Sequence, residues 1–199
     1  INTKLRDLNR YVDKAKLKFS GGTLTSEIKY EGKLSEYLDS TVATYSGKLT
    51  GKIEARNASW EYLQGDKTFQ KTDLLVRFNE RQVDIDTVIT TVNGNTMDYK
   101  GAVRGFVPFF YQPKKKGNVK LFIHSQRLDL ATLMKKKTGR KKAQPLKGNK
   151  GLSEFIDAMY TKADFEADFK VDELINGPFR ANAVVGKLRM ADNRLYADP

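Results

Sequence analysis

The stretch Thr23-Leu-Thr-Ser-Glu-Ile-Lys-Tyr-Glu-Gly-Lys-Leu34 shows the pattern that dominates this chain. Successive side chains of a β-strand point to opposite faces, so apolar residues that recur every second position form one apolar face. Here Leu24 and Ile28 fall on one side, and Glu27 and Lys29 fall on the other. The stretch therefore predicts a strand with one apolar face and one solvated face, which is typical of antiparallel sheets.

The same alternation recurs along most of the chain. Asn93-Gly94 lies between two alternating runs and predicts a tight hairpin turn. We expect eight to ten strands in a mainly β protein, arranged as a curved antiparallel sheet that forms an open groove or half-barrel rather than a closed barrel. The further strands are expected at 45–55, 74–78, 83–89, 97–103, 119–123, 163–171, 179–185 and 195–196.

Two or three short helices are expected beside the strands. Residues 152–159 place apolar side chains at helical spacing, with Ser153 as the N-cap. A second helix is predicted at 128–137, opened by Asp129, and a third within residues 1–12. We expect one β-rich domain over residues 1–199, with a basic flexible loop at 135–150. The chain begins without a basic leader and ends just after a strand, so we interpret it as a fragment of a larger protein.

Several classes of chemistry find no support in the residues. The chain has no cysteine, which excludes disulfides, thiolate metal sites and cysteine catalysis. The single histidine, His124, should lie on the solvated face of its strand, with Ser125 on the other face. Asp164, Glu166 and Asp168 share a strand face; they could bind Ca²⁺, but their spacing is also that of an ordinary solvated face. We therefore expect no enzyme activity, no metal and no cofactor.

The net charge of +12 is concentrated in one segment. Residues 113–150 contain thirteen Lys or Arg and one acid, whereas the rest of the chain has 23 of each sign. Such a block predicts a tethered basic loop that contacts an anionic lipid surface, or one that is simply solvated. Nucleic acid is disfavoured, because 132–151 offers no aromatic side chain on which bases could stack. The expected headgroup contacts are Lys114, Lys115, Lys116, Lys135, Lys136, Lys137, Arg140, Lys141 and Lys142.

Several strands together resemble a known family. The matching runs are Leu121-Phe-Ile-His-Ser-Gln-Arg-Leu-Asp-Leu130, Ala163-Asp-Phe-Glu-Ala-Asp-Phe-Lys-Val171 and Gly186-Lys-Leu-Arg-Met190. They resemble the C-terminal half of AsmA-like proteins, large envelope proteins that include TamB relatives. The resemblance implies a long β-groove, apolar inside, in a periplasmic protein anchored in the inner membrane of Gram-negative bacteria. It also implies phospholipid transport and outer-membrane biogenesis, with other envelope proteins as partners. The basic loop at 135–150 departs from the family pattern.

On this interpretation the apolar strand face holds acyl chains, and the basic loops meet anionic headgroups. A structural or protein-interaction domain without a ligand explains the same alternation equally well. The residues expected to line the groove are Leu24, Ile28, Leu49, Ile53, Val76, Phe78 and Ile85.

Overall fold

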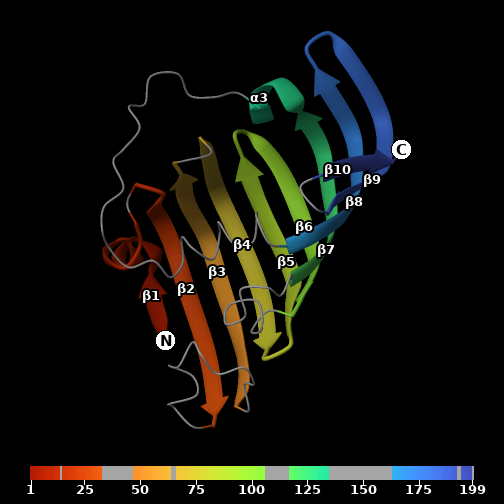
Figure 1. The fold of residues 1–199 in the computed structure, drawn as a ribbon. Coiled ribbons are helices and arrows are strands. Elements are labelled where there is room, and N and C mark those ends of the chain that lie inside the picture. Colours follow the sequence, from red (N-terminus) through yellow and green to blue (C-terminus); the bar gives the residue numbers. More distant parts are fainter. Residues whose placement is uncertain are drawn as a thin grey trace.

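The computed structural model describes residues 1–13, 15–32, 47–63, 66–105, 117–134, 163–191 and 194–198. Ten strands form one open, curved sheet, and their order in space follows the sequence (Figure 1). The predicted mainly β architecture with an open sheet is confirmed, and the described residues include two of the two or three short helices expected. The strands are β1 (Asn2–Lys4), β2 (Leu17–Glu31), β3 (Lys48–Tyr62), β4 (Lys67–Asn79), β5 (Gln82–Val92), β6 (Asn95–Arg104), β7 (Gly117–Asp129), β8 (Ala163–Asn176), β9 (Phe179–Ala191) and β10 (Arg194–Asp198); the helices are η1 (Leu5–Arg10) and α3 (Leu130–Met134).

One joint of the sheet differs from the antiparallel pattern. Strands β7 and β8 run parallel, from Gly117 beside Ala163 to Asp129 beside Ile175, while every other neighbouring pair is antiparallel. Parallel neighbours need a crossover of a dozen or more residues. The long connection after β7, which begins with α3, supplies that crossover.

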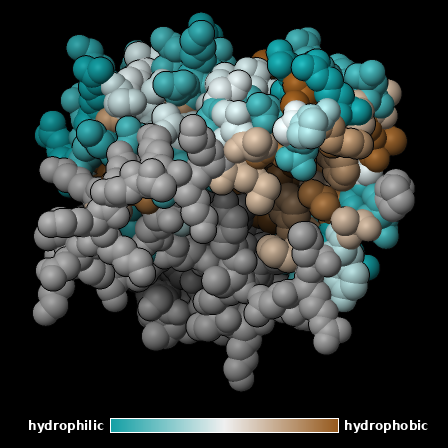
Figure 2. All heavy atoms as spheres, turned by 90° about the horizontal axis from the view of Figure 1, so that it is seen from above, coloured by the Kyte–Doolittle hydropathy of each residue, from teal (hydrophilic) through white to brown (hydrophobic). Residues whose placement is uncertain are grey.

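Strand register gives the sheet one continuous apolar face, which we call the inner face. A single cross-strand row on this face crosses eight strands from β2 to β9. Figure 2 shows apolar residues gathered where the sheet curves inward and hydrophilic residues over much of the remaining coloured surface. The row consists of Ile28, Gly51, Phe78, Val83, Val103, Val119, Phe165 and Met190.

Glycines on the inner face allow aromatic rings to pack closely against the backbone of the sheet. A Cβ atom at Gly51 would lie 2.4 Å from the Phe78 ring, and one at Gly186 would lie 2.5 Å from the Phe169 ring. Real Cβ atoms do not approach that closely, so only glycine permits these contacts. Each ring thus covers backbone that has no side chain of its own, and the glycines mark positions at which the sheet can bend.

The N-terminal segment forms the short strand β1 and then the 3₁₀ helix η1, within the range where a short helix was expected. Ser26 donates its backbone N–H to the Ile1 carbonyl oxygen at 2.8 Å, which holds the first residues along the outer edge of β2. Asn9 then bonds both backbone groups of Phe19, with 2.8 Å for each contact. The helix predicted within residues 1–12 is thus present as the 3₁₀ helix η1, while edge pairing with β2 satisfies the backbone of residues 2–4.

The turn at Asn93-Gly94 is confirmed, with positive φ angles of 48° and 86°. Asp129 opens α3 as predicted: Thr132 donates its backbone N–H to Oδ1 at 3.1 Å and its hydroxyl to Oδ2 at 2.9 Å. These hydrogen bonds lower the pKa of Asp129. The helix expected at 152–159 lies outside the described residues. Among the described residues no helix is long and apolar enough to cross a bilayer.

Candidate functional site

The predicted groove residues all share the inner face. Cross-strand register places each of them on the side that carries the apolar rows. Six of the seven are half-buried, and Ile28 is 61% exposed. The structure therefore brings together the predicted set, which consists of Leu24, Ile28, Leu49, Ile53, Val76, Phe78 and Ile85.

Exposure falls along the inner face from β2 towards the middle of the sheet. In one cross-strand row, Ile28 on β2 is 61% exposed, Val83 on β5 is 9% exposed and Val119 on β7 is 2% exposed. Phe78 and Phe165 pack against the buried members of this row. The apolar face is thus a packed core near β5 to β7 and remains accessible near β2.

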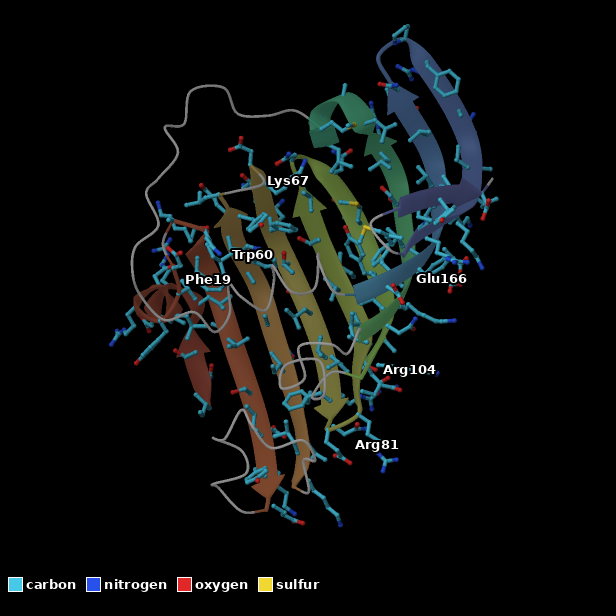
Figure 3. All side chains as sticks on the ribbon, viewed as in Figure 1. Phe19, Trp60, Lys67, Arg81, Arg104 and Glu166 are labelled. Carbon is cyan, nitrogen blue, oxygen red and sulfur yellow. The ribbon has the colours of Figure 1, made fainter. Side chains whose placement is uncertain are left out.

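Aromatic side chains occupy one end of the inner face. Phe19, Trp60 and Phe69 are cross-strand neighbours on β2, β3 and β4. The rings of Trp60 and Phe69 stack at a centroid distance of 4.9 Å, and Figure 3 shows Phe19 and Trp60 at this end of the sheet. Leu5 and Leu8 of η1 belong to the same cluster. The sequence interpretation missed these residues, although their period-two spacing was the available signal.

The opposite, outer face carries charges that pair across strands. Glu166 lies between Lys120 at 3.5 Å and Lys187 at 3.4 Å, and the hydrogen bond from Lys187 is the main cause of its lowered pKa. The guanidinium of Arg77 donates two hydrogen bonds to the carboxylate of Asp86 in a bidentate arrangement, at 2.6 and 2.8 Å. No group of three possible metal ligands occurs in the part of the chain that the structure describes. Pairs of opposite charge on neighbouring strands stabilise a solvated sheet face. The acidic residues of the outer face, such as Glu166 and Asp86, form pairs of this kind.

Two arginines at one end of the sheet differ from these paired cations. Arg81 and Arg104 are exposed, and neither forms an ion pair with another described residue. The Gly105 N–H donates to the Arg81 carbonyl oxygen at 2.8 Å, which holds the two segments together (Figure 3). Sequence reasoning missed them because their surroundings are neutral overall. The predicted lysine contacts at 114–116 and 135–142 lie outside the described residues.

His124 lies on the outer face, as its strand position predicted. Its Nε2 atom is 3.2 Å from Oδ2 of Asp172. Ser125 points to the inner side, is 2% exposed and donates its hydroxyl to the Thr96 carbonyl oxygen at 2.9 Å. The serine and histidine therefore point apart, and a nucleophile–base pair between these two residues is not formed. Asp98 is the direct cross-strand neighbour of His124, beside a polar cleft of the outer face.

No family model, no curated protein and no solved structure matches this chain.

Proposed function

We propose that this chain is a non-catalytic segment of an AsmA-like envelope protein, which holds or conducts phospholipid during outer-membrane biogenesis. In this proposal the parent protein is periplasmic and anchored in the inner membrane. The support is the continuous apolar row across eight strands, backed by a charged outer face. Contiguous apolar surface that remains accessible on a folded chain usually marks a binding surface.

The open end of this surface determines where an acyl chain would bind. Near β2 the row begins at Ile28, which is 61% exposed, and continues past Gly51 to the ring of Phe78. On the inner face Ile53 lies one row from Ile28 and Leu24 lies two rows from it, and both are half-buried. An acyl chain bound along these positions would remove apolar surface from water, which stabilises the complex by about 25 cal/mol for each Å² buried.

Cations support an anionic headgroup. Arg81 and Arg104 present guanidinium groups without carboxylate partners among the described residues, and guanidinium matches phosphate oxygens in a bidentate geometry. Both arginines lie close in sequence to the buried pair Val83 and Val103 at one end of the inner face. The lysine loops at 114–116 and 135–142 would add charge to the same lipid surface.

A structural or protein-interaction domain without a lipid is the second candidate. It is favoured by the cluster of Val83, Val103 and Val119, which packs partners from β4 to β8 as an ordinary core does. If the whole inner face behaves in this way, its apolar residues stabilise the fold and no acyl chain enters.

Lipid carriage by matched variants separates the two candidates. Ile28 on the inner face is 61% exposed and Val185 on the outer face is 60% exposed, so Ile28→Asp and Val185→Asp should each leave stability almost unchanged. After incubation with phosphatidylglycerol vesicles, native mass spectrometry should show bound phospholipid on the wild-type chain and on Val185→Asp. Ile28→Asp should carry less. A lipid-free mass for the wild-type chain, or equal carriage by both variants, would contradict the lipid proposal.

A further inference from the structure

The outer face carries a cleft of about 560 Å³ that the lipid proposal does not use. It lies where the β5–β6 turn, the end of β7 and the first turn of α3 meet. Its volume is within the range of small-molecule sites. The residues that matter for its chemistry are Ile89, Asn95, Asp98, His124, Gln126 and Arg127.

Buried polar side chains hold the walls of this cleft in place. Asn95 is 4% exposed, and its Oδ1 accepts the backbone N–H of Asp129 at 2.6 Å across 34 residues of sequence. Ser125 is 2% exposed, and its hydroxyl lies 2.9 Å from the carbonyl oxygens of Thr96 and Arg127, which share its single proton. Such hydrogen bonds between distant segments fix the surrounding backbone, as a preorganised site requires.

Asp98 is the group in this cleft whose hydrogen-bonding capacity is unused. Its Oδ1 is buried, and it is the one buried side-chain polar atom without a hydrogen-bond partner in the part of the chain that the structure describes. Its cross-strand neighbours are Ile89 and His124, and the histidine contacts Asp172 instead. A buried carboxylate oxygen without a donor costs more free energy than a buried neutral acceptor without one. Asp98 itself is half-buried and lines the cleft, so rotation of its carboxylate can bring this oxygen to a donor bound there.

The other charged side chains of the cleft have polar partners within the chain. Asp129 accepts hydrogen bonds from Thr132, and Arg127 lies 3.5 Å from Glu173. The unmatched charge in the cleft is therefore negative, and a cationic donor satisfies it better than a neutral hydroxyl because charge-assisted hydrogen bonds are about twice as strong.

We propose that this cleft binds a small organic cation, a primary ammonium compound, whose N–H groups meet the Asp98 carboxylate. Ile89, which is 42% exposed beside Asp98, contacts the alkyl part of the ligand. The Gln126 side-chain amide lines the same cleft and can bond a polar substituent. The site lies on the face opposite the apolar rows, so it is independent of lipid carriage.

Ethanolammonium chloride is the probe, titrated into the full chain while ¹H–¹⁵N spectra follow the Thr96 and Gln126 amides. Saturable shifts are expected with this salt and not with sodium chloride at equal ionic strength or with glycerol. Asp98→Asn should weaken binding at least tenfold. Asp168→Asn removes a carboxylate from the same face, 3.4 Å from Lys187 and away from the cleft, and should bind as the wild-type chain does.

A second variant keeps the test informative if Asp98→Asn disturbs the fold. The lysine introduced by Ile89→Lys places an ammonium on the neighbouring strand, where it can pair with Asp98 and abolish probe binding. Equal shifts with glycerol or sodium chloride would overturn the proposal. So would unchanged binding by Asp98→Asn, or the absence of any saturable shift, which would mean that no cation binds Asp98 in this cleft.

Discussion

Aspartate introduced along one cross-strand row tests whether the inner face is open at β2 and sealed at β7. The substitutions are Ile28→Asp, Phe78→Asp and Val119→Asp, each made singly. All three residues lie in the same row, and they differ in how deeply their side chains are buried. The expected loss of stability therefore follows exposure, which falls from 61% at Ile28 to 2% at Val119.

The expected magnitudes follow from burial. Val119→Asp removes a buried side chain that contributes about 1.5–3 kcal/mol and buries an unpaired carboxylate, so the total loss should exceed about 4 kcal/mol. Ile28→Asp should change the free energy of unfolding by no more than about 0.5 kcal/mol, as surface substitutions usually do. Phe78→Asp should fall between the two, because the half-buried Phe78 ring loses its contact over Gly51.

Urea denaturation followed by tryptophan fluorescence provides the measurement, since the single Trp60 lies within the sheet. A constant m-value would show that each variant still unfolds as the same cooperative unit. Phe122→Asp is the matched control, because Phe122 is 46% exposed on the outer face. Severe destabilisation by Ile28→Asp, equal to that of Val119→Asp, would refute the open groove and leave an ordinary sealed core.

Three further predictions concern the backbone, the charges and the loops. Gly51→Val should destabilise the fold by about 1–3 kcal/mol in urea denaturation, because the new Cβ would meet the Phe78 ring at 2.4 Å; Gly21→Val, where a Cβ meets nothing within 4 Å, is the control. The lowered pKa of Glu166 means that its ionised carboxylate stabilises the fold above the unfolded pKa near 4.5, and that this stabilisation is lost as pH falls through the folded pKa. Glu166→Gln should therefore make the melting temperature fall less steeply as the pH is lowered below about 4.5. Six serine substitutions in the basic loop should abolish salt-sensitive binding to anionic vesicles, because each charge contributes about 1 kcal/mol near such a surface; equal binding by this variant would remove the role from the loop. The substituted residues are Lys135, Lys136, Lys137, Arg140, Lys141 and Lys142.

Alternation of apolar and polar residues was sufficient to predict the fold class and the inner face. A strand's side-chain period is two, so the assignment of Val76 and Ile85 to one face needs no knowledge of the strand order. Turn chemistry added the hairpin at Asn93-Gly94, because positive φ favours these residues. Local capping chemistry likewise predicted that Asp129 opens a helix.

Long-range pairing was beyond this kind of prediction. The parallel joint between β7 and β8 depends on the path of the connection between them, which local periodicity does not encode. Asp98 was overlooked for a similar reason. In the sequence it is one more acid on a solvated strand face, and its surroundings depend on the residues that the neighbouring strands place beside it, Ile89 and His124.

The distribution of burial explains how a single curved sheet can have both a core and an accessible apolar surface. Side chains from β4 to β8, including Phe78 and Phe165, converge on Val83, Val103 and Val119, so this part of the row contributes to stability much as a domain core does. Ile28 lies on β2, outside that cluster, and stays exposed. A ligand that covers only the β2 side would gain apolar contact without disrupting the packed residues. Binding and folding therefore rely on different segments of one row, and substitutions can separate them.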